Sequence, residues 1–250
     1  MSFHLAGLYR NVGVGSTFVE LLPIADSAWP TNPATSRFWS SSEARVFAAY
    51  AGGTSLSRAR VYSPWRLPNE IRPVNNGVLP VSVPAMASWL SVPMRVPASQ
   101  DMIFDAVHTN AAAQDIVGLA WLTTEGLTPR PDGDIITIRG DVSGAAPGVR
   151  LWSELTSVVW EYILPPGRYA VVGSECISTN AIAHRWILEG SNARPGAVSQ
   201  SQVYSIPSAY QMYGTLGTWG TFTVPLMPRL EVLCNAADAV HTVFLQVVAL

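Results

Sequence analysis

The two halves of the chain repeat the same landmarks, and this repeat constrains the fold more than any other feature of the sequence. Short motifs recur in the same order at separations of 121 to 132 residues, about half of the 250-residue chain. The matched motifs are Leu8-Tyr9-Arg10 with Thr137-Ile138-Arg139, Phe38-Trp39 with Val159-Trp160, Arg45-Val46-Phe47-Ala48-Ala49 with Arg168-Tyr169-Ala170-Val171-Val172, Trp65 with Trp186, Arg72-Pro73 with Arg194-Pro195, Trp89 with Trp219 followed by Val92-Pro93-Met94 with Val224-Pro225-Leu226, and, without a gap, 104–122 with 232–250. A period of this kind indicates a duplicated structural unit.

The local pattern predicts β-strands. Residues alternate with period two in several stretches, and Val243, Leu245 and Val247 share one face of the last stretch. Turn residues such as Pro131-Asp132-Gly133 and Pro165-Pro166-Gly167 separate these stretches. Many short strands joined by Gly/Pro turns are typical of a sandwich or a barrel.

Two stretches of the first half are ambiguous by themselves. Residues 44–53 follow a capping-box-like Ser-Ser-Ser-Glu, and residues 111–122 are rich in Ala. The counterpart of the first follows Pro-Pro-Gly, and the counterpart of the second is β-branched and aromatic. We therefore predict that both are strands.

Each half has room for about eight strands, the number in a jelly roll. The sequence thus predicts an all-β protein of two tandem eight-stranded jelly-roll sandwiches, a double jelly roll. Residues 1–126 would form the first jelly roll with an N-terminal segment, and residues 127–250 would form the second.

Charge is sparse. Charged residues make up 13% of the chain, all 15 basic side chains are Arg, and the net charge is −2. This is roughly one charge per 340 Å² of a folded surface. Biased codon usage would explain it, and so would burial of much of the surface against other chains.

The spacing of His and Asp residues does not predict a metal site. His4, His108, His184 and His241 lack a second ligand at i+2 or i+4, so each is interpreted as a satisfied or surface histidine. Asp132 and Asp134 with Asp141 lack the spacing of a calcium loop, and turn chemistry explains them better. We predict no metal site and no cofactor.

Catalytic and nucleic-acid-binding patterns are missing from the sequence as well, and we predict no catalytic residue. There is no Gly-X-Ser-X-Gly elbow, and a P-loop is impossible without Lys. Glu154 and Glu161 would be the carboxylate pair of a glycosidase, although surface strand residues have the same spacing. Arg is dispersed and no basic arm exists, which disfavours sequence-specific nucleic-acid binding. Most tryptophans, such as Trp121 and Trp160, lie in apolar strands and are predicted core residues.

Cys176 and Cys234 lie in apolar stretches without metal spacing, and we interpret them as free buried thiols, with a disulfide as the alternative. The first 15 residues do not resemble a signal peptide, and no apolar run reaches 18 residues.

Taken together, the chain resembles the double jelly-roll major capsid proteins of tailless, icosahedral, membrane-containing bacterial viruses. The resemblance lies in the repeat LYR…FW…ARVFAA…RP…W…VPM against TIR…VW…GRYAVV…RP…W…VPL, in the two halves of about 120 residues and in the composition.

The resemblance implies a structural, non-enzymatic protein that forms homotrimeric, pseudo-hexameric capsomers in an icosahedral shell. Its partners would be further copies of itself, other capsid proteins such as vertex or minor proteins, and an internal membrane. Residues 1–14 would contact that membrane or a neighbouring capsomer. The protein would be located in the virion, after assembly in the host cytoplasm.

A second class of function is a tandem β-sandwich lectin or receptor-binding spike. Tyr204, Tyr210 and Tyr213, near Trp219, form an aromatic-rich stretch whose rings would stack on sugars. A third reading, a single jelly-roll trimer with a second decorating domain, holds if the repeat is spurious.

Overall fold

The protein is all-β. The structure, a computed structural model, describes residues 4–13, 17–24, 29–53, 55–64, 69–71, 87–88, 93–125, 129–146, 151–155, 158–189, 193–198, 217–234 and 236–250. Strands are the regular elements of these ranges, which confirms the predicted fold class. Within them, no helix has the length and apolar character needed to cross a bilayer.

The described residues from His4 to Glu125 form one compact unit, here called the N-terminal unit. Its strands are β1 (His4–Val12), β2 (Val19–Glu20), β3 (Leu22–Pro23), β4 (Phe38–Trp39), β5 (Ala44–Gly53), β6 (Leu56–Tyr62), β7 (Asn69–Ile71), β8 (Ala87–Ser88), β9 (Met94–Val96), β10 (Asp101–His108) and β11 (Gln114–Thr123). One sheet has the order β3-β1-β11-β5-β8, with β9 also on β5. The other has the order β2-β10-β6-β7, with β4 also on β10.

The described residues from Pro129 to Leu250 belong to the second compact unit, here called the C-terminal unit. Its strands are β12 (Ile136–Ala146), β13 (Trp152–Leu155), β14 (Val159–Trp160), β15 (Gly167–Ile177), β16 (Ala181–Ile187), β17 (Ala193–Val198), β18 (Gly220–Val224), β19 (Arg229–Cys234) and β20 (Asp238–Ala249). Its sheets have the orders β14-β12-β20-β15-β18 and β13-β19-β16-β17.

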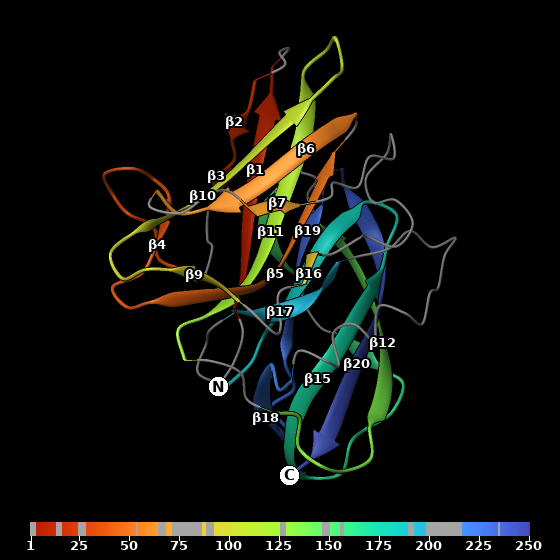
Figure 1. Cartoon of the computed structure of the whole chain (residues 1–250). Coiled ribbons are helices and arrows are strands. Elements are labelled where there is room, and N and C mark those ends of the chain that lie inside the picture. Colours follow the sequence, from red (N-terminus) through yellow and green to blue (C-terminus); the bar gives the residue numbers. More distant parts are fainter. Residues whose placement is uncertain are drawn as a thin grey trace. The chain divides into compact units, whose positions relative to one another are not determined.

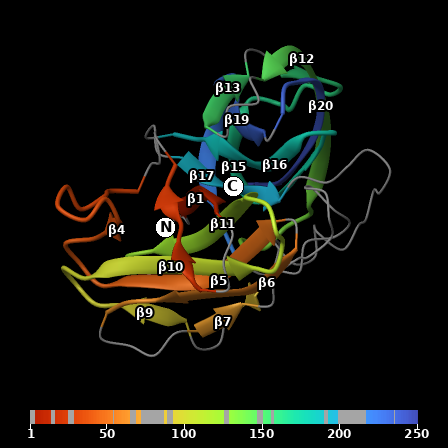
Figure 2. The ribbon, with the colours of Figure 1, turned by 90° about the horizontal axis from the view of Figure 1, so that it is seen from above.

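The two units have the same topology. In each, the first and last long strands pair at the centre of one sheet, as β1 with β11 and β12 with β20 (Figure 1). The second sheets correspond strand by strand, β2-β10-β6-β7 to β13-β19-β16-β17, and the sheets of each unit can be followed as layers in Figure 2. Two sheets with these crossed connections form a jelly roll. The repeat in the sequence is therefore a repeat of the fold.

Cross-strand pairing, combined with which side chains are buried, identifies equivalent positions. Leu8 pairs with Gly118, which also pairs with Ala51. In the C-terminal unit the same relation joins Ile138, Leu245 and Ser174. The equivalent pairs are Leu8 with Ile138, Gly118 with Leu245 and Ala51 with Ser174. In the second sheets, the sequence match of Phe104 with Val232 makes Val61 the counterpart of His184.

This register corrects the predicted alignment in two strand pairs. The sequence match placed buried Leu8 on Thr137, which is exposed, and the gapless match placed Gly118 on Gln246. Both are wrong by one residue, because a slip of one reverses the face of every side chain. The connection at 109–113 is longer than that at 235–237, so a gapless match cannot hold across it. For β5 and β15 the predicted alignment agrees with the pairing, since Val46 and Tyr169 occupy equivalent positions.

One further expectation is wrong. Phe38-Trp39 is not equivalent to Val159-Trp160, because β4 pairs with β10 in the second sheet whereas β14 pairs with β12 in the first. The structural counterpart of β14 is β3, which pairs with β1. Of the N-terminal segment 1–14, His4–Val12 forms β1, which lies between β3 and β11, and its contact with a membrane or a neighbouring capsomer stays a prediction.

The strand predictions for the ambiguous segments are confirmed by β5 and β11. Val243, Leu245 and Val247 are fully buried, as their alternation predicts, and so is Trp121. Trp160 is half-buried and stacks on Trp186, with ring centroids 5.8 Å apart. The landmarks Trp65, Arg72-Pro73 and Trp89 lie outside the described residues, as do Tyr204, Tyr210 and Tyr213.

Candidate interaction surfaces

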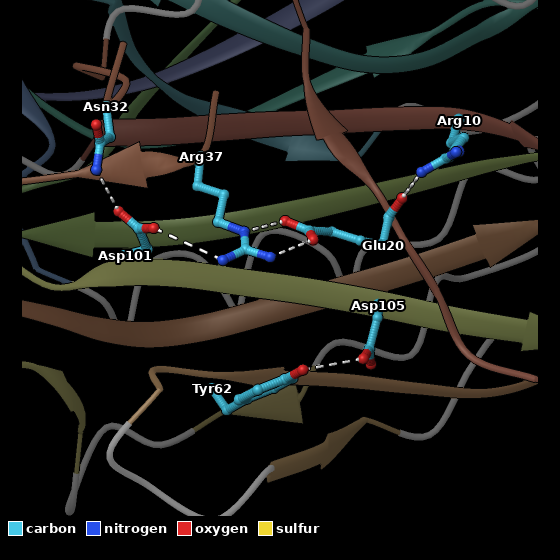
Figure 3. Close-up of polar contacts among 7 residues, drawn as sticks. All are labelled: Arg10, Glu20, Asn32, Arg37, Tyr62, Asp101 and Asp105. Atoms are coloured by element: carbon cyan, nitrogen blue, oxygen red, sulfur yellow. Dashed lines mark hydrogen bonds and ion pairs between the residues drawn. The ribbon is translucent and has the colours of Figure 1, made fainter. Parts of the chain in front are cut away.

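An ionic network covers one part of the second sheet of the N-terminal unit (Figure 3). Arg37 binds both carboxylate oxygens of Glu20, through Nε at 2.6 Å and Nη2 at 2.7 Å, and its Nη1 lies 3.7 Å from Asp101. Asn32 donates to the other oxygen of Asp101 at 3.0 Å. The pKa of Arg37 is raised by the hydrogen bond to Glu20. The network joins the loop before β4 to β2 and β10.

A second bidentate pair lies on the same sheet. Arg60 on β6 donates to both oxygens of Asp105 on β10, at 2.7 and 2.6 Å, and Tyr62 donates to the same carboxylate at 3.2 Å. Arg60 also lies over the ring of Phe18, 3.6 Å from its centroid. The hydrogen bond to Asp105 raises the pKa of Arg60, and burial raises the pKa of Tyr62.

The C-terminal unit repeats this arrangement at neighbouring positions. Arg185 on β16 binds Glu231 on β19, and its guanidinium lies 4.3 Å from the centroid of the Trp152 ring on β13. Both units thus place an arginine between a carboxylate and an aromatic ring on the second sheet. Sequence analysis missed both sets, because their members lie on different strands and the spacing along the chain carries no sign of them.

A buried polar chain links the two sheets of the C-terminal unit. Ser174 on β15 accepts a hydrogen bond from the Trp186 indole at 2.7 Å, and its Oγ lies 2.7 Å from Nε2 of His184 on β16. A serine this close to a histidine has the geometry of an activated nucleophile. All three side chains have no exposed surface, so a substrate has no access to the serine. The contact therefore ties the two sheets together.

The remaining histidines are also held within the fold. The His108 ring contacts the Val12 carbonyl at 3.0 Å, and His4 packs edge-on against Trp29. His241 is fully buried, and its burial lowers its pKa. Burial raises the pKa of nearby Asp238, but hydrogen bonds from Ser178 and from two backbone amides outweigh this and lower it.

The candidate carboxylates of the sequence do not come together. Glu154 lies on β13 and binds Arg229 at 2.9 Å, whereas Glu161 follows β14 in the other sheet. Asp141 binds Thr242 at 2.7 Å and Arg139 at 3.1 Å. No group of three His, Cys, Asp or Glu side chains able to hold a metal occurs among the described residues.

Both cysteines are buried and neither forms a disulfide, which confirms the predicted thiols. They lie in different sheets, Cys176 on β15 and Cys234 on β19. Burial raises the pKa of Cys234 to about 12, so its thiol stays protonated and unreactive at neutral pH.

Exposed apolar side chains are unevenly distributed. Among the described residues, Leu22 is the exposed large apolar residue of the N-terminal unit. Those of the C-terminal unit are Ile135, Ile136, Leu151, Val159, Tyr162, Ile163, Leu226, Val240 and Leu250. Leu226 borders a groove of about 600 Å³ beside the β18–β19 connection. Where such residues are neighbours, as Val159, Tyr162 and Ile163 are along the chain, they are candidates for an interaction site.

Comparison with solved structures finds two viral capsid proteins. The chain is similar over 98% of its length to 98% of the major capsid protein P2 of bacteriophage PM2, with 10% identity and a TM-score of 0.26. It is also similar over its whole length to 97% of the STIV MCP, with 9% identity and a TM-score of 0.23. The sequence matches no protein-family model and no curated protein.

Proposed function

We propose that this chain is a structural capsid protein of a virus. The observation that carries the proposal is the occurrence of the same jelly-roll strand order twice in one chain. Jelly rolls build viral capsids and lectin domains, so the fold alone does not select between them. The contact between Ser174 and His184 is enclosed, and the candidate carboxylate Glu154 is paired with Arg229. Both observations favour a structural protein over an enzyme.

Surface chemistry supports a role in assembly. The chain carries few charges, and nine large apolar side chains are exposed among the described residues of its C-terminal unit. A shell protein buries much of its surface against neighbours, where apolar and aromatic side chains with Arg are favoured. Contacts between copies would also cover the sheet edges, which otherwise pair without control.

In the proposed assembly, three copies form a pseudo-hexameric capsomer, and capsomers tile an icosahedral shell. The further partners are other capsid proteins, such as vertex or minor proteins, and an internal membrane. The protein acts in the virion after assembly in the host cytoplasm. Its net charge of −2 disfavours direct, sequence-specific binding of nucleic acid.

Electron microscopy and light scattering of the purified chain test this function. We expect trimers on size exclusion with light scattering, and particles of pseudo-sixfold outline in negative stain. A chain that stays monomeric up to high micromolar concentration contradicts the proposal. If that monomer also binds a glycan array, the lectin function replaces it.

A further inference from the structure

A rigid apolar projection leaves one edge of the first sheet of the C-terminal unit. We call it the knob; it consists of Val159, Tyr162 and Ile163, which are 71%, 64% and 93% exposed. Three large apolar side chains with this exposure within five residues are unusual on a soluble surface. The knob is held at both ends, because the Glu161 amide donates to the Arg139 carbonyl at 2.9 Å and Leu164 is buried. A fixed projection loses little conformational entropy when it binds.

The groove beside β18 provides a receptor of matching chemistry. Ile187, Leu188, Phe222 and Met227 line it together with Leu226, which is 74% exposed. Its volume of about 600 Å³ lies in the range of pockets that hold bulky ligands and accommodates more than one side chain. Backbone hydrogen bonds fix its outer wall, from Leu226 to Thr223 at 2.8 Å and from Met227 to Pro225 at 2.9 Å.

The knob and the groove lie at opposite edges of one sheet. The knob begins on β14 and the groove adjoins β18, at the two ends of the order β14-β12-β20-β15-β18. Figure 1 shows β12 and β18 on opposite sides of β15 and β20. Four strand spacings separate these edges, about 19 Å. Since Ile163 is 93% exposed, the knob of a chain does not occupy the groove of the same chain.

Charged groups beside the two features are complementary. Glu161 and Arg139 lie beside the knob, and their backbones are hydrogen-bonded to each other. Glu189 and Arg229 line the groove, and the Arg229 side chain is 58% exposed. Within one chain Arg139 already pairs with Asp141, and Arg229 pairs with Glu154 through Nη1, but a guanidinium carries five N–H donors. When the knob enters a groove, Arg229 can therefore add Glu161 as a second acceptor, and Arg139 can add Glu189. A lipid surface carries charged headgroups as well, but it does not present a carboxylate and a guanidinium at fixed positions beside an apolar groove.

We propose that the knob of one copy inserts into the groove of a second copy of this chain, with Ile163 against Leu226. The inference rests on the proposed assembly function and names a contact through which it occurs. Because the two surfaces differ, the contact is head-to-tail and leaves each bound copy with one free knob or groove. Such contacts propagate into rings or lattices and do not stop at a dimer.

Two single variants and their mixture test this contact. We expect Ile163→Asp and Leu226→Asp each to weaken association roughly 30-fold or more, as a central contact residue does. An equimolar mixture should form a one-to-one dimer, because the intact knob of the Leu226→Asp chain fits the intact groove of the Ile163→Asp chain. The matched control is Val240→Asp, a half-exposed apolar residue of β20 outside both features, which should assemble as the unsubstituted chain does.

Light scattering and circular dichroism read out the result. The contact is refuted if a folded Ile163→Asp or Leu226→Asp chain assembles as the unsubstituted chain does, or if the mixture of two monomeric variants stays monomeric. In both cases an unsubstituted chain that assembles still supports the capsid function, whereas a monomeric unsubstituted chain refutes that function too. Loss of flotation with phosphatidylcholine vesicles in Ile163→Asp, with assembly unchanged, assigns the knob to a lipid surface and overturns the proposal.

Discussion

The N-terminal and C-terminal units carry different side chains at equivalent positions of one strand order. Ala51 and Val61 line the N-terminal core, and their equivalents Ser174 and His184 form a polar contact in the C-terminal core. On the second sheets, the Arg60–Asp105 pair is replaced by Ala183 and Leu233. The comparison teaches that strand order persists while polar contacts move from position to position.

The units also differ in what they expose. In the N-terminal unit, the ion pairs of Arg37 and Arg60 link the strands and loops of the second sheet. Most of the exposed apolar residues among the described residues belong to the C-terminal unit. This division assigns the knob and groove contact to one unit. It also gives each unit its own weak points, which substitutions can probe separately.

The largest expected effect comes from the aromatic anchor of each core. Trp186→Ala removes a fully buried indole and should lower the free energy of unfolding by about 3–5 kcal/mol. Hydrogen exchange read by mass spectrometry should show faster exchange in β15, β16, β19 and β20, with β1, β5, β10 and β11 unchanged. Phe104→Ala is the corresponding variant of the N-terminal unit. It should speed exchange in β1, β5, β10 and β11 and leave β15, β16, β19 and β20 unchanged. Equal loss of protection in both units would contradict the two-unit comparison.

The ion pairs of the second sheets should differ next. Glu231→Ala leaves Arg185, only 3% exposed, without its carboxylate and should cost roughly 3 kcal/mol. Asp105→Ala should cost less, about 1–2 kcal/mol, because Arg60 is 24% exposed and retains its contact with Phe18. Urea unfolding measures both. An Asp105→Ala loss equal to or larger than that of Glu231→Ala would show that exposure of the arginine does not control the cost.

Exchanging polar and apolar core residues between the units gives a smaller effect. Ser174→Ala leaves the Trp186 indole without its acceptor and should cost about 1–2 kcal/mol. Ala51→Ser places a hydroxyl among buried apolar neighbours and should cost a similar amount. A neutral Ala51→Ser would mean that the N-terminal core already offers a hydrogen-bond partner at this position. Thermal and urea unfolding of the two variants provide the measurement.

The smallest expected difference between the units is in how their stability changes in mild acid. Buried His241 has a pKa below its ordinary value of 6.5, so the unfolded chain takes up a proton before the folded one as the pH falls. C-terminal stability should therefore decline below pH 6.5, by at most about 1.4 kcal/mol per pH unit. The lowered pKa of Asp238 adds a second loss below its ordinary value of 3.8. The variant His241→Gln should reduce the first decline, measured as unfolding free energy against pH; an unchanged pH profile would refute the assignment.

Sequence reasoning was strongest where the signal is local or repeated. Alternation identified the buried face of Val243, Leu245 and Val247, and the repeat resolved β5 and β11 as strands. It failed in register, as at Leu8, because conserved landmarks tolerate a slip of one residue while side-chain facing does not. It also paired Phe38-Trp39 with Val159-Trp160, since two aromatic dipeptides give no information on which sheet they join.

The contact surfaces were less accessible to sequence than the fold. Pairing of β6 with β10 brings Arg60 to Asp105, and Phe18 contacts Arg60 from the segment just before β2, so no spacing along the chain predicts this group. Tyr162 and Ile163 look like core residues in the sequence, and only the short β14 and the buried Leu164 show that they project from the surface. The Ser174–His184 contact depends on two strands of opposite sheets and lacks a catalytic motif.

The pairing of first and last strands at the centre of each sheet sets the order in which the chain can fold during its synthesis. Leu8 can pair with Gly118, and Ile138 with Leu245, only after the intervening residues of the unit have been synthesised. At ordinary translation rates this delay is roughly 5–20 s. During it, the first strand of the unit is part of the nascent chain and its backbone groups are not yet paired with the last strand. The N-terminal unit can complete its sheets before the C-terminal unit has been synthesised. Strands of one unit therefore need not pair wrongly with strands of the other.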